Sequence, residues 1–124
     1  MIQTIEIPML PPRALNPNGR AHWAAKRKAA EPMKQVAALQ GKQLRPISGP
    51  ATVTVTFIVA QNRRRDGDNW LASMKPVMDV LVHTGLFTDD DSRHISYAPV
   101  RFEVDKHRAP MTVLEISEEQ IATT

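Results

Sequence analysis

Residues 51–60, ATVTVTFIVA, carry the strongest strand signal in the sequence. Val53, Val55 and Phe57 alternate with threonines, so one face of the segment is apolar and the other carries hydroxyl groups. A two-residue period and many β-branched side chains are typical of a half-buried β-strand. We therefore expect this strand to lie inside a sheet, with its apolar face turned to the core.

The segment after this strand turns polar and then becomes helical. Residues 61–69, QNRRRDGDN, contain Asp-Gly-Asp and predict a turn. Pro76 fits a helix best in its first turn, so we expect residues 69–73 to be partly irregular and the regular helix to begin near residue 73. A helical face over residues 70–83, closed by a C-cap at Gly85, is predicted by apolar side chains at helical spacing: Trp70, Met74, Val77 and Leu81.

Further elements are expected on both sides of this region. Residues 95–105 and 111–116 predict two strands, and the short connection between them favours an antiparallel hairpin. Residues 2–9 predict a strand, and residues 21–43 predict a helix that ends at a Pro- and Gly-containing break. The expected buried stripe of that helix is Ala29, Met33, Val36, Ala37 and Leu44.

The order of these elements predicts a single α+β domain over residues 1–124. We expect a mixed sheet of about four strands, with two main helices on one side. The chain has no cysteine, which excludes disulfides and thiolate chemistry. No apolar run approaches the roughly 20 residues of a membrane span, so we expect a cytoplasmic protein without a membrane partner.

Charge is distributed unevenly along the chain, whose formal net charge at pH 7 is +3. Residues 13–45 hold eight basic residues and one acid, Glu31, whereas residues 66–91 hold six acids and one base, Lys75. A basic segment can hold a polyanion through its phosphates, and an acidic cluster can hold divalent cations. A metal-dependent nuclease needs both, although two solvated faces of opposite sign would give the same pattern.

The acids form two groups at the ends of the expected second helix. Asp66 and Asp68 precede it, and the glycine between them permits a bend that turns both carboxylates toward one ion. Three aspartates at 89–91 follow it, about 21 Å away if the helix is regular throughout. The structural alternatives are a helix N-cap at Asp68, a solvated turn at 89–91, and an exposed pair of Lys75 with Asp79.

Together these residues resemble the signature of the RusA family of Holliday-junction resolvases. The resemblance lies in residues 63–95, with an Asp-x-Asp-Asn, a lysine four residues before an Asp-x-Leu, a glycine and then paired aspartates. Residues 15–23, LNPNGRAHW, also resemble the family's N-terminal segment, a turn before a basic helix. Lys75 follows Asp68 by about one helical turn more than in the family's usual pattern, a spacing similar to that of phage-type members.

The resemblance implies a mixed α/β fold, a homodimer and cleavage of four-way DNA junctions, in a bacterial or prophage-encoded protein. It implies dependence on Mg²⁺, with Mn²⁺ as a substitute. Asp89 would be a neighbouring helper, and Asp91 makes the last ligand ambiguous, although the distance from the family's glycine favours the middle aspartate. The implied catalytic residues are Asp66, Asp68, Asp90 and Lys75, of which the three aspartates bind the metal.

Basic residues outside the acidic groups are the expected phosphate contacts, which position a duplex without reading its sequence. Trp23 is either a stacking surface for an exposed base or a packed side chain. No histidine shows metal-ligand spacing. The expected DNA contacts are Arg20, Lys26, Arg27, Lys28, Arg64 and Arg65.

Three other functions remain open at this stage. The same site would serve a nuclease that acts on flaps or replication forks. A DNA-binding protein without catalysis would use the acids only as helix caps and solubilising groups. A metal-dependent hydrolase of nucleotides is disfavoured, because the basic first helix suits a long polyanion better than a small one.

Overall fold

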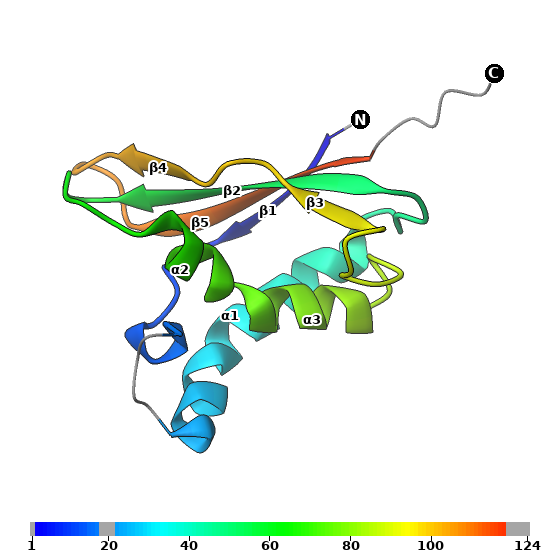
Figure 1. Cartoon of the computed structure of the whole chain (residues 1–124), viewed down its shortest axis with the longest axis horizontal. Helices are drawn as coiled ribbons and strands as arrows, with labels where there is room; N and C mark the ends of the chain where they lie inside the picture. Colours follow the sequence, from blue (N-terminus) through cyan, green and yellow to red (C-terminus); the bar gives the residue numbers. More distant parts are fainter. Residues whose placement is uncertain (1, 18–21, 119–124) are drawn as a thin grey trace.

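The chain folds into one sheet covered by helices on one face (Figure 1). The computed structural model describes residues 2–17 and 22–118. The expected α+β class, with helices on one side of a mixed sheet, is confirmed. In the described ranges no helix is long and apolar enough to cross a membrane. The elements are β1 (Ile2–Ile7), the 3-10 helix η1 (Arg13–Leu15), α1 (Trp23–Gln43), β2 (Ala51–Val59), α2 (Gly67–Ala72), α3 (Lys75–His83), β3 (Ile95–Tyr97), β4 (Arg101–Val104) and β5 (Met111–Glu118).

The sheet has five strands, and β2 pairs along both of its edges. On one side β5 lies between β1 and β2 and runs antiparallel to both. On the other side β2 pairs in parallel with β3 over residues 51–53 and with β4 over residues 56–59. The register places Ile5, Leu114 and Val55 side by side on three strands, so their apolar side chains share one face.

The expected strand over residues 95–105 is two strands, and the expected hairpin is wrong. Residues 98–100 separate β3 from β4. β2 lies between β4 and β5 and pairs with each of them. Residues 105–110 therefore cross the end of β2, where the Asp105 amide donates to the Val59 carbonyl at 2.8 Å. A short connection here joins two strands that flank a third, and a sequence pattern cannot distinguish this arrangement from a hairpin.

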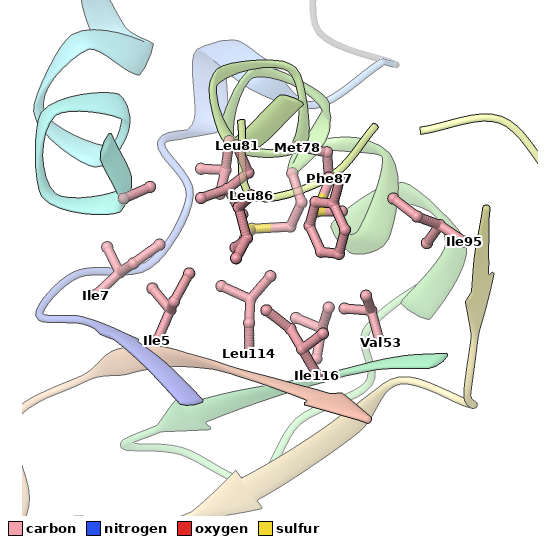
Figure 2. Close-up of a cluster of buried hydrophobic side chains, with 14 of the residues drawn as sticks. Ile5, Ile7, Val53, Met78, Leu81, Leu86, Phe87, Ile95, Leu114 and Ile116 are labelled. Atoms are coloured by element: carbon pink, nitrogen blue, oxygen red, sulfur yellow. The ribbon is translucent and has the colours of Figure 1, made fainter. Parts of the chain in front are cut away.

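The hydrophobic core fills the space between the sheet and the helices (Figure 2). The predicted alternation of β2 is confirmed, because Val53, Val55 and Phe57 all lie in this core. Burying one such side chain contributes roughly 1.5–3 kcal/mol. Members of the core that are at most 3% exposed include Ile5, Ile7, Met78, Leu81, Leu86, Phe87, Leu114 and Ile116.

The first long helix, α1, ends at Gln43 as predicted and is capped at its start by His22. The Nδ1 atom of His22 accepts a hydrogen bond from the Ala24 amide at 3.3 Å. A Cβ atom at Gly41 would lie 2.7 Å from Cδ2 of Leu81, so the absence of a side chain there lets α1 pack closely on α3. The buried stripe is shifted from the expected one and consists of Ala30, Met33, Ala37 and Gly41, with Val36 and Leu44 half-buried.

The expected helix over residues 70–83 is divided into α2 and α3. Ser73 and Met74 join the two helices, and Pro76 is the second residue of α3. Proline is tolerated there because the first turn of a helix leaves its N–H groups without intrahelical partners. The expectation that residues 69–73 are partly irregular is wrong, because residues 69–72 belong to α2, whose helix starts earlier with Asp66 as its N-cap. A new helix does begin just after residue 73, and Lys75 stands at the start of α3.

Gly85 ends α3 and turns the chain back toward the sheet, at φ +90°. Its amide donates to the Val82 carbonyl and the Leu86 amide donates to the Leu81 carbonyl, both at 3.0 Å. These two bonds form a Schellman motif, which satisfies carbonyls at the helix end. The predicted C-cap is confirmed, and it sends residues 88–94 back beside the helix that they follow.

Candidate active site

Lys75 is held between two carboxylates. Its ammonium nitrogen Nζ donates to Oδ1 of Asp79 at 3.0 Å and to Oδ2 of Asp90 at 2.5 Å. Asp79 lies one turn further along α3, whereas Asp90 comes from the acidic turn after the helix. The side chain of Asp90 is 21% exposed and that of Lys75 is 63% exposed, so the pair is only partly shielded from water. The lysine therefore reaches one of the three aspartates expected at the metal site.

This contact stabilises the charged forms of both groups. The hydrogen bond to Asp90, and after it the bond to Asp79, raises the pKa of Lys75 above its ordinary value. The hydrogen bond from Lys75 is the main cause that lowers the pKa of Asp90. Near neutral pH the lysine is a cation and the aspartate an anion. Lys75 is therefore suited to stabilising negative charge rather than to removing a proton.

Asp68 and Lys75 open onto one cavity of about 280 Å³. Asp68 lies in the first turn of α2, and the cavity continues over Leu71 and Met78 to Tyr97 on β3. The structure shows no hydrogen bond or ion pair from the Asp68 carboxylate to any described residue. Its oxygens are thus available to a ligand beside the ammonium group of Lys75.

Tyr97 is a residue of this cavity that the sequence did not indicate. It is 41% exposed and stands opposite Val53 in the parallel pairing of β3 with β2. Burial raises the pKa of Tyr97, and the nearby negative charge of Asp90 raises it further. The phenol stays protonated near neutral pH and can donate a hydrogen bond to an anion. Its place depends on a long-range strand pairing, for which the local sequence holds no signal.

Asp66 is the N-cap of α2. Its Oδ1 accepts from the amides of Asp68 at 3.0 Å and Asn69 at 3.3 Å, and its Oδ2 accepts from Nδ2 of Asn69 at 3.2 Å. The capping role, one of the structural alternatives, therefore exists but belongs to Asp66 rather than to Asp68. A carboxylate can accept about four hydrogen bonds, so three leave limited capacity for a cation.

The three aspartates of the acidic turn have different partners. Oδ1 of Asp89 accepts from the backbone amide of Asp90 at 2.7 Å. Oδ1 of Asp91 lies 2.7 Å from Nδ1 of His94, and its Oδ2 accepts from the Arg93 guanidinium at 3.1 Å. The contact with His94 is the main cause that lowers the pKa of Asp91 to about 2. Among these acids it is Asp90 whose side chain lies against Lys75.

The three expected metal ligands are not assembled into one group. Within residues 2–17 and 22–118, no three His, Cys, Asp or Glu side chains are grouped so that they could hold a metal ion. Asp66 is directed at backbone amides, whereas Asp68 shares a cavity with Lys75 and Asp90 is bonded to it. Carboxylate oxygens are the donors that Mg²⁺ prefers. Asp68 and Asp90 therefore fit a magnesium ion by their chemistry, with Asp66 as a neighbour.

The basic residues of α1 lie next to this site. Lys26, Arg27 and Lys34 line a cavity of about 310 Å³ together with Lys75 and Asp79. Lys34 was not among the expected DNA contacts, although its position two helical turns after Arg27 puts both on one helix face and could have indicated it. The expected phosphate-binding helix and the expected catalytic lysine therefore face one shared space.

The other expected DNA contacts differ in their surroundings. Arg64 is exposed, and Lys28 lines a separate cavity near Trp23. The guanidinium of Arg65 lies 5.8 Å from the ring centres of Trp70 and Phe102, which makes it part of the packing over β4. Arg20 lies outside the described residues.

No protein-family model matches the chain, and no curated protein matches it either. The geometry of Asp68, Lys75 and Asp90 is therefore what characterises the site.

Proposed function

We propose that this protein is a magnesium-dependent endonuclease that resolves four-way DNA junctions, in recombination and repair. The observation that carries the proposal is the position of Lys75. Its ammonium group is bonded to Asp90 and opens onto the cavity of Asp68, while the cations of α1 line the adjoining cavity. Carboxylates suited to a metal, a cation suited to stabilising charge and basic side chains suited to phosphates lie in one region, and this supports the proposal.

The chemistry of phosphodiester hydrolysis uses these groups in separate ways. A bound Mg²⁺ would polarise a phosphoryl oxygen and lower the pKa of a water molecule. Asp68 and Asp90 would hold it, with Asp66 as a further donor. Lys75 donates to Oδ2 of Asp90, so a cation would bind through the other oxygen of this carboxylate. Lys75 would stabilise the negative charge that builds on the phosphoryl oxygens during attack, as preorganised cations do.

The proposed substrate requires two copies of the chain. Resolution of a four-way junction cuts two strands that are related by a two-fold axis, so a homodimer with two such sites matches the symmetry of the substrate. The cleavage reaction itself would use the residues of one copy at each strand.

A cleavage experiment tests this proposal. A labelled synthetic four-way junction is incubated with Mg²⁺, Mn²⁺ or EDTA beside a linear duplex, a flap and a fork of matched sequence. We expect paired nicks in the junction that require a divalent cation, and an intact duplex. Asp68→Asn should abolish them, whereas Glu103→Gln should not, because Glu103 is an exposed carboxylate on β4 outside the site. Junction binding without nicks under any cation would indicate a DNA-binding protein without catalysis. Nicks confined to flaps or forks would show that these, and not four-way junctions, are the substrate.

A further inference from the structure

Three cavities that include residues of α1, α2 and α3 follow one another through shared lining residues. The first, of about 320 Å³, is lined by Trp23 and Arg27. Arg27 also lines the second, which contains Lys75, and Lys75 in turn lines the third, which ends at Tyr97. We call this path the α1 track and define it by Trp23, Lys26, Arg27, Lys34, Lys75 and Tyr97. It leads from the first turn of α1 to the proposed active site.

The spacing of the α1 residues explains why they share this path. Trp23, Arg27 and Lys34 are separated by four and seven residues, which places them along one face of a helix. Ala30 lies between them, only 2% exposed, at the floor of the second cavity. At 1.5 Å per residue, the segment from Trp23 to Lys34 is roughly 16 Å long. An extended ligand of several repeating units, rather than one small ion, fits such a row.

Trp23 is exposed, in contrast to the other tryptophan of the chain. Its relative exposure is 63%, and the Arg27 guanidinium lies 5.8 Å from its ring centre. Trp70, by comparison, packs edge-on against Phe57, with 4.9 Å between ring centres. The sequence alone left a stacking role and a packed role open for Trp23. Its exposure removes the packed role and leaves a flat aromatic surface beside the Arg27 guanidinium.

The balance of charge is positive along the α1 part of the track, where four basic residues face Glu31 and Asp79: Lys26, Arg27, Lys28 and Lys34. In the first two cavities Glu31 lies 3.9 Å from Lys34, and Asp79 is bonded to Lys75, which also bonds Asp90. The third cavity holds the acid Asp68, so the positive charge lies along α1 rather than at the proposed active site. The side chains of Lys26 and Arg27 form no ion pair with a described residue, which leaves two cations between the aromatic ends. A polyanion is the ligand that this arrangement favours.

We infer that the α1 track binds an unpaired segment of DNA and leads it to Lys75, with phosphates on the cations of α1 and a base stacked on Trp23. Proteins bind single-stranded nucleic acid with a row of cations along the phosphate backbone and with exposed aromatic rings on which the bases stack. Bases inside a duplex are stacked on one another and offer no free face to Trp23. The inference rests on the proposed function for the identity of the polymer, and adds that the bound part of the substrate is single-stranded.

Binding measured in EDTA tests the inference without any cleavage. A fluorescein-labelled oligothymidylate is titrated with protein and followed by anisotropy, beside a labelled duplex of equal length. Trp23→Ala should weaken binding of the oligothymidylate about 5- to 150-fold, since stacking of one base contributes that range. Trp23→Phe should keep most of the affinity, and duplex binding should change much less than single-strand binding.

The salt dependence of the same binding tests the cations. Each lost phosphate contact reduces the slope of log affinity against log salt by about 0.7 for a single strand. Lys34→Gln should show this change, whereas Lys42→Gln, in the last turn of the same helix and outside the track, should not. The inference would be overturned if Trp23→Ala bound the oligothymidylate as tightly as the wild type, or if the two lysine variants had equal slopes. Junction cleavage by the wild type would still support the proposed function in that case. If the variants bound the oligothymidylate as expected but the wild type cleaved no junction, only the proposed function would be overturned.

Discussion

The Nζ atom of Lys75 lies 2.5 Å from Oδ2 of Asp90, across fifteen residues of sequence. The contact exists because α3 has only 9 residues and the chain reverses at Gly85. A helix of that length is about 14 Å long, which a lysine side chain and the returning turn together can bridge. The acidic turn and the start of α3 thus form one site although a helix separates them in the chain.

The ion pair of Lys75 with Asp90 should make stability depend on pH in a defined direction. The pKa of Asp90 is lowered in the folded protein, so its contribution is present above the unfolded value of about 3.9 and is lost as pH falls through the folded value. Lys75→Met should lower the free energy of unfolding by about 0.2–1 kcal/mol at pH 7, the scale of solvent-screened pairs. Urea unfolding should show this difference shrinking toward pH 2. A difference that stays constant between pH 7 and pH 2 would contradict the pairing.

Lys75 should also be needed for cleavage. Removing one group that stabilises charge in a transition state typically lowers the rate 10²- to 10³-fold. We expect Lys75→Met to lower junction cleavage by about this factor, with junction affinity in EDTA reduced far less. Lys106→Met serves as the control, because Lys106 is exposed in the turn between β4 and β5. Equal rates for the two variants in single-turnover assays would show that Lys75 acts only in folding.

Two substitutions of Asp66 can distinguish its role as a helix N-cap from a role in metal binding. Asp66→Ala removes the N-cap of α2 and should cost about 0.5–2 kcal/mol of stability. Asp66→Asn keeps an oxygen that accepts from the backbone amides, so thermal unfolding should stay close to the wild type. If the carboxylate also contributes to the metal, Asp66→Asn should cleave more slowly and need more Mg²⁺ for half-maximal rate. Cleavage by Asp66→Asn with unchanged Mg²⁺ dependence would limit this residue to its capping role.

Gly85→Ala should destabilise the protein by roughly 1–2 kcal/mol, the cost of a left-handed conformation for a residue with a Cβ atom. No atom lies within 4 Å of the position of that Cβ, so the effect would come from the backbone alone. Gly49→Ala is the matched control, because the new Cβ there would make an ordinary contact at 3.9 Å and the backbone lies outside the left-handed region. Denaturant unfolding should therefore show a loss for Gly85→Ala and no comparable loss for Gly49→Ala.

Local patterns in the sequence predicted the elements well. The alternation of Val53, Val55 and Phe57 marked the buried face of β2, and Pro76 and Gly85 marked the two ends of α3. Each of these signals depends on the geometry of a few neighbouring residues. The pairing of strands was harder to predict, because β4 and β5 could equally pair with each other or flank a third strand. The hairpin expectation failed for that reason.

The site was predictable in its residue types but not in its arrangement. The sequence singled out Asp66, Asp68, Asp90 and Lys75. In the structure Asp90 is bonded to Lys75, and Asp68 lines a cavity with it. That Asp66 turns to the backbone follows from the start of α2, which the sequence placed later in the chain. Tyr97 enters the site only through the pairing of β3 with β2, which depends on the whole sheet.

The insertion of β5 between β1 and β2 has a consequence for how the chain acquires its structure. β1 and β2 do not pair with each other, and only β5, residues 111–118, joins them by pairing with both. A ribosome adds roughly 5–20 residues per second. Until it has synthesised β5, the apolar faces of the earlier strands and helices are therefore incompletely covered. Formation of the sheet depends on distant segments, which makes the folding rate slow relative to that of helical bundles. The nascent chain should therefore acquire its ordered site late in synthesis, which pulse-labelled hydrogen exchange on stalled chains of increasing length would detect.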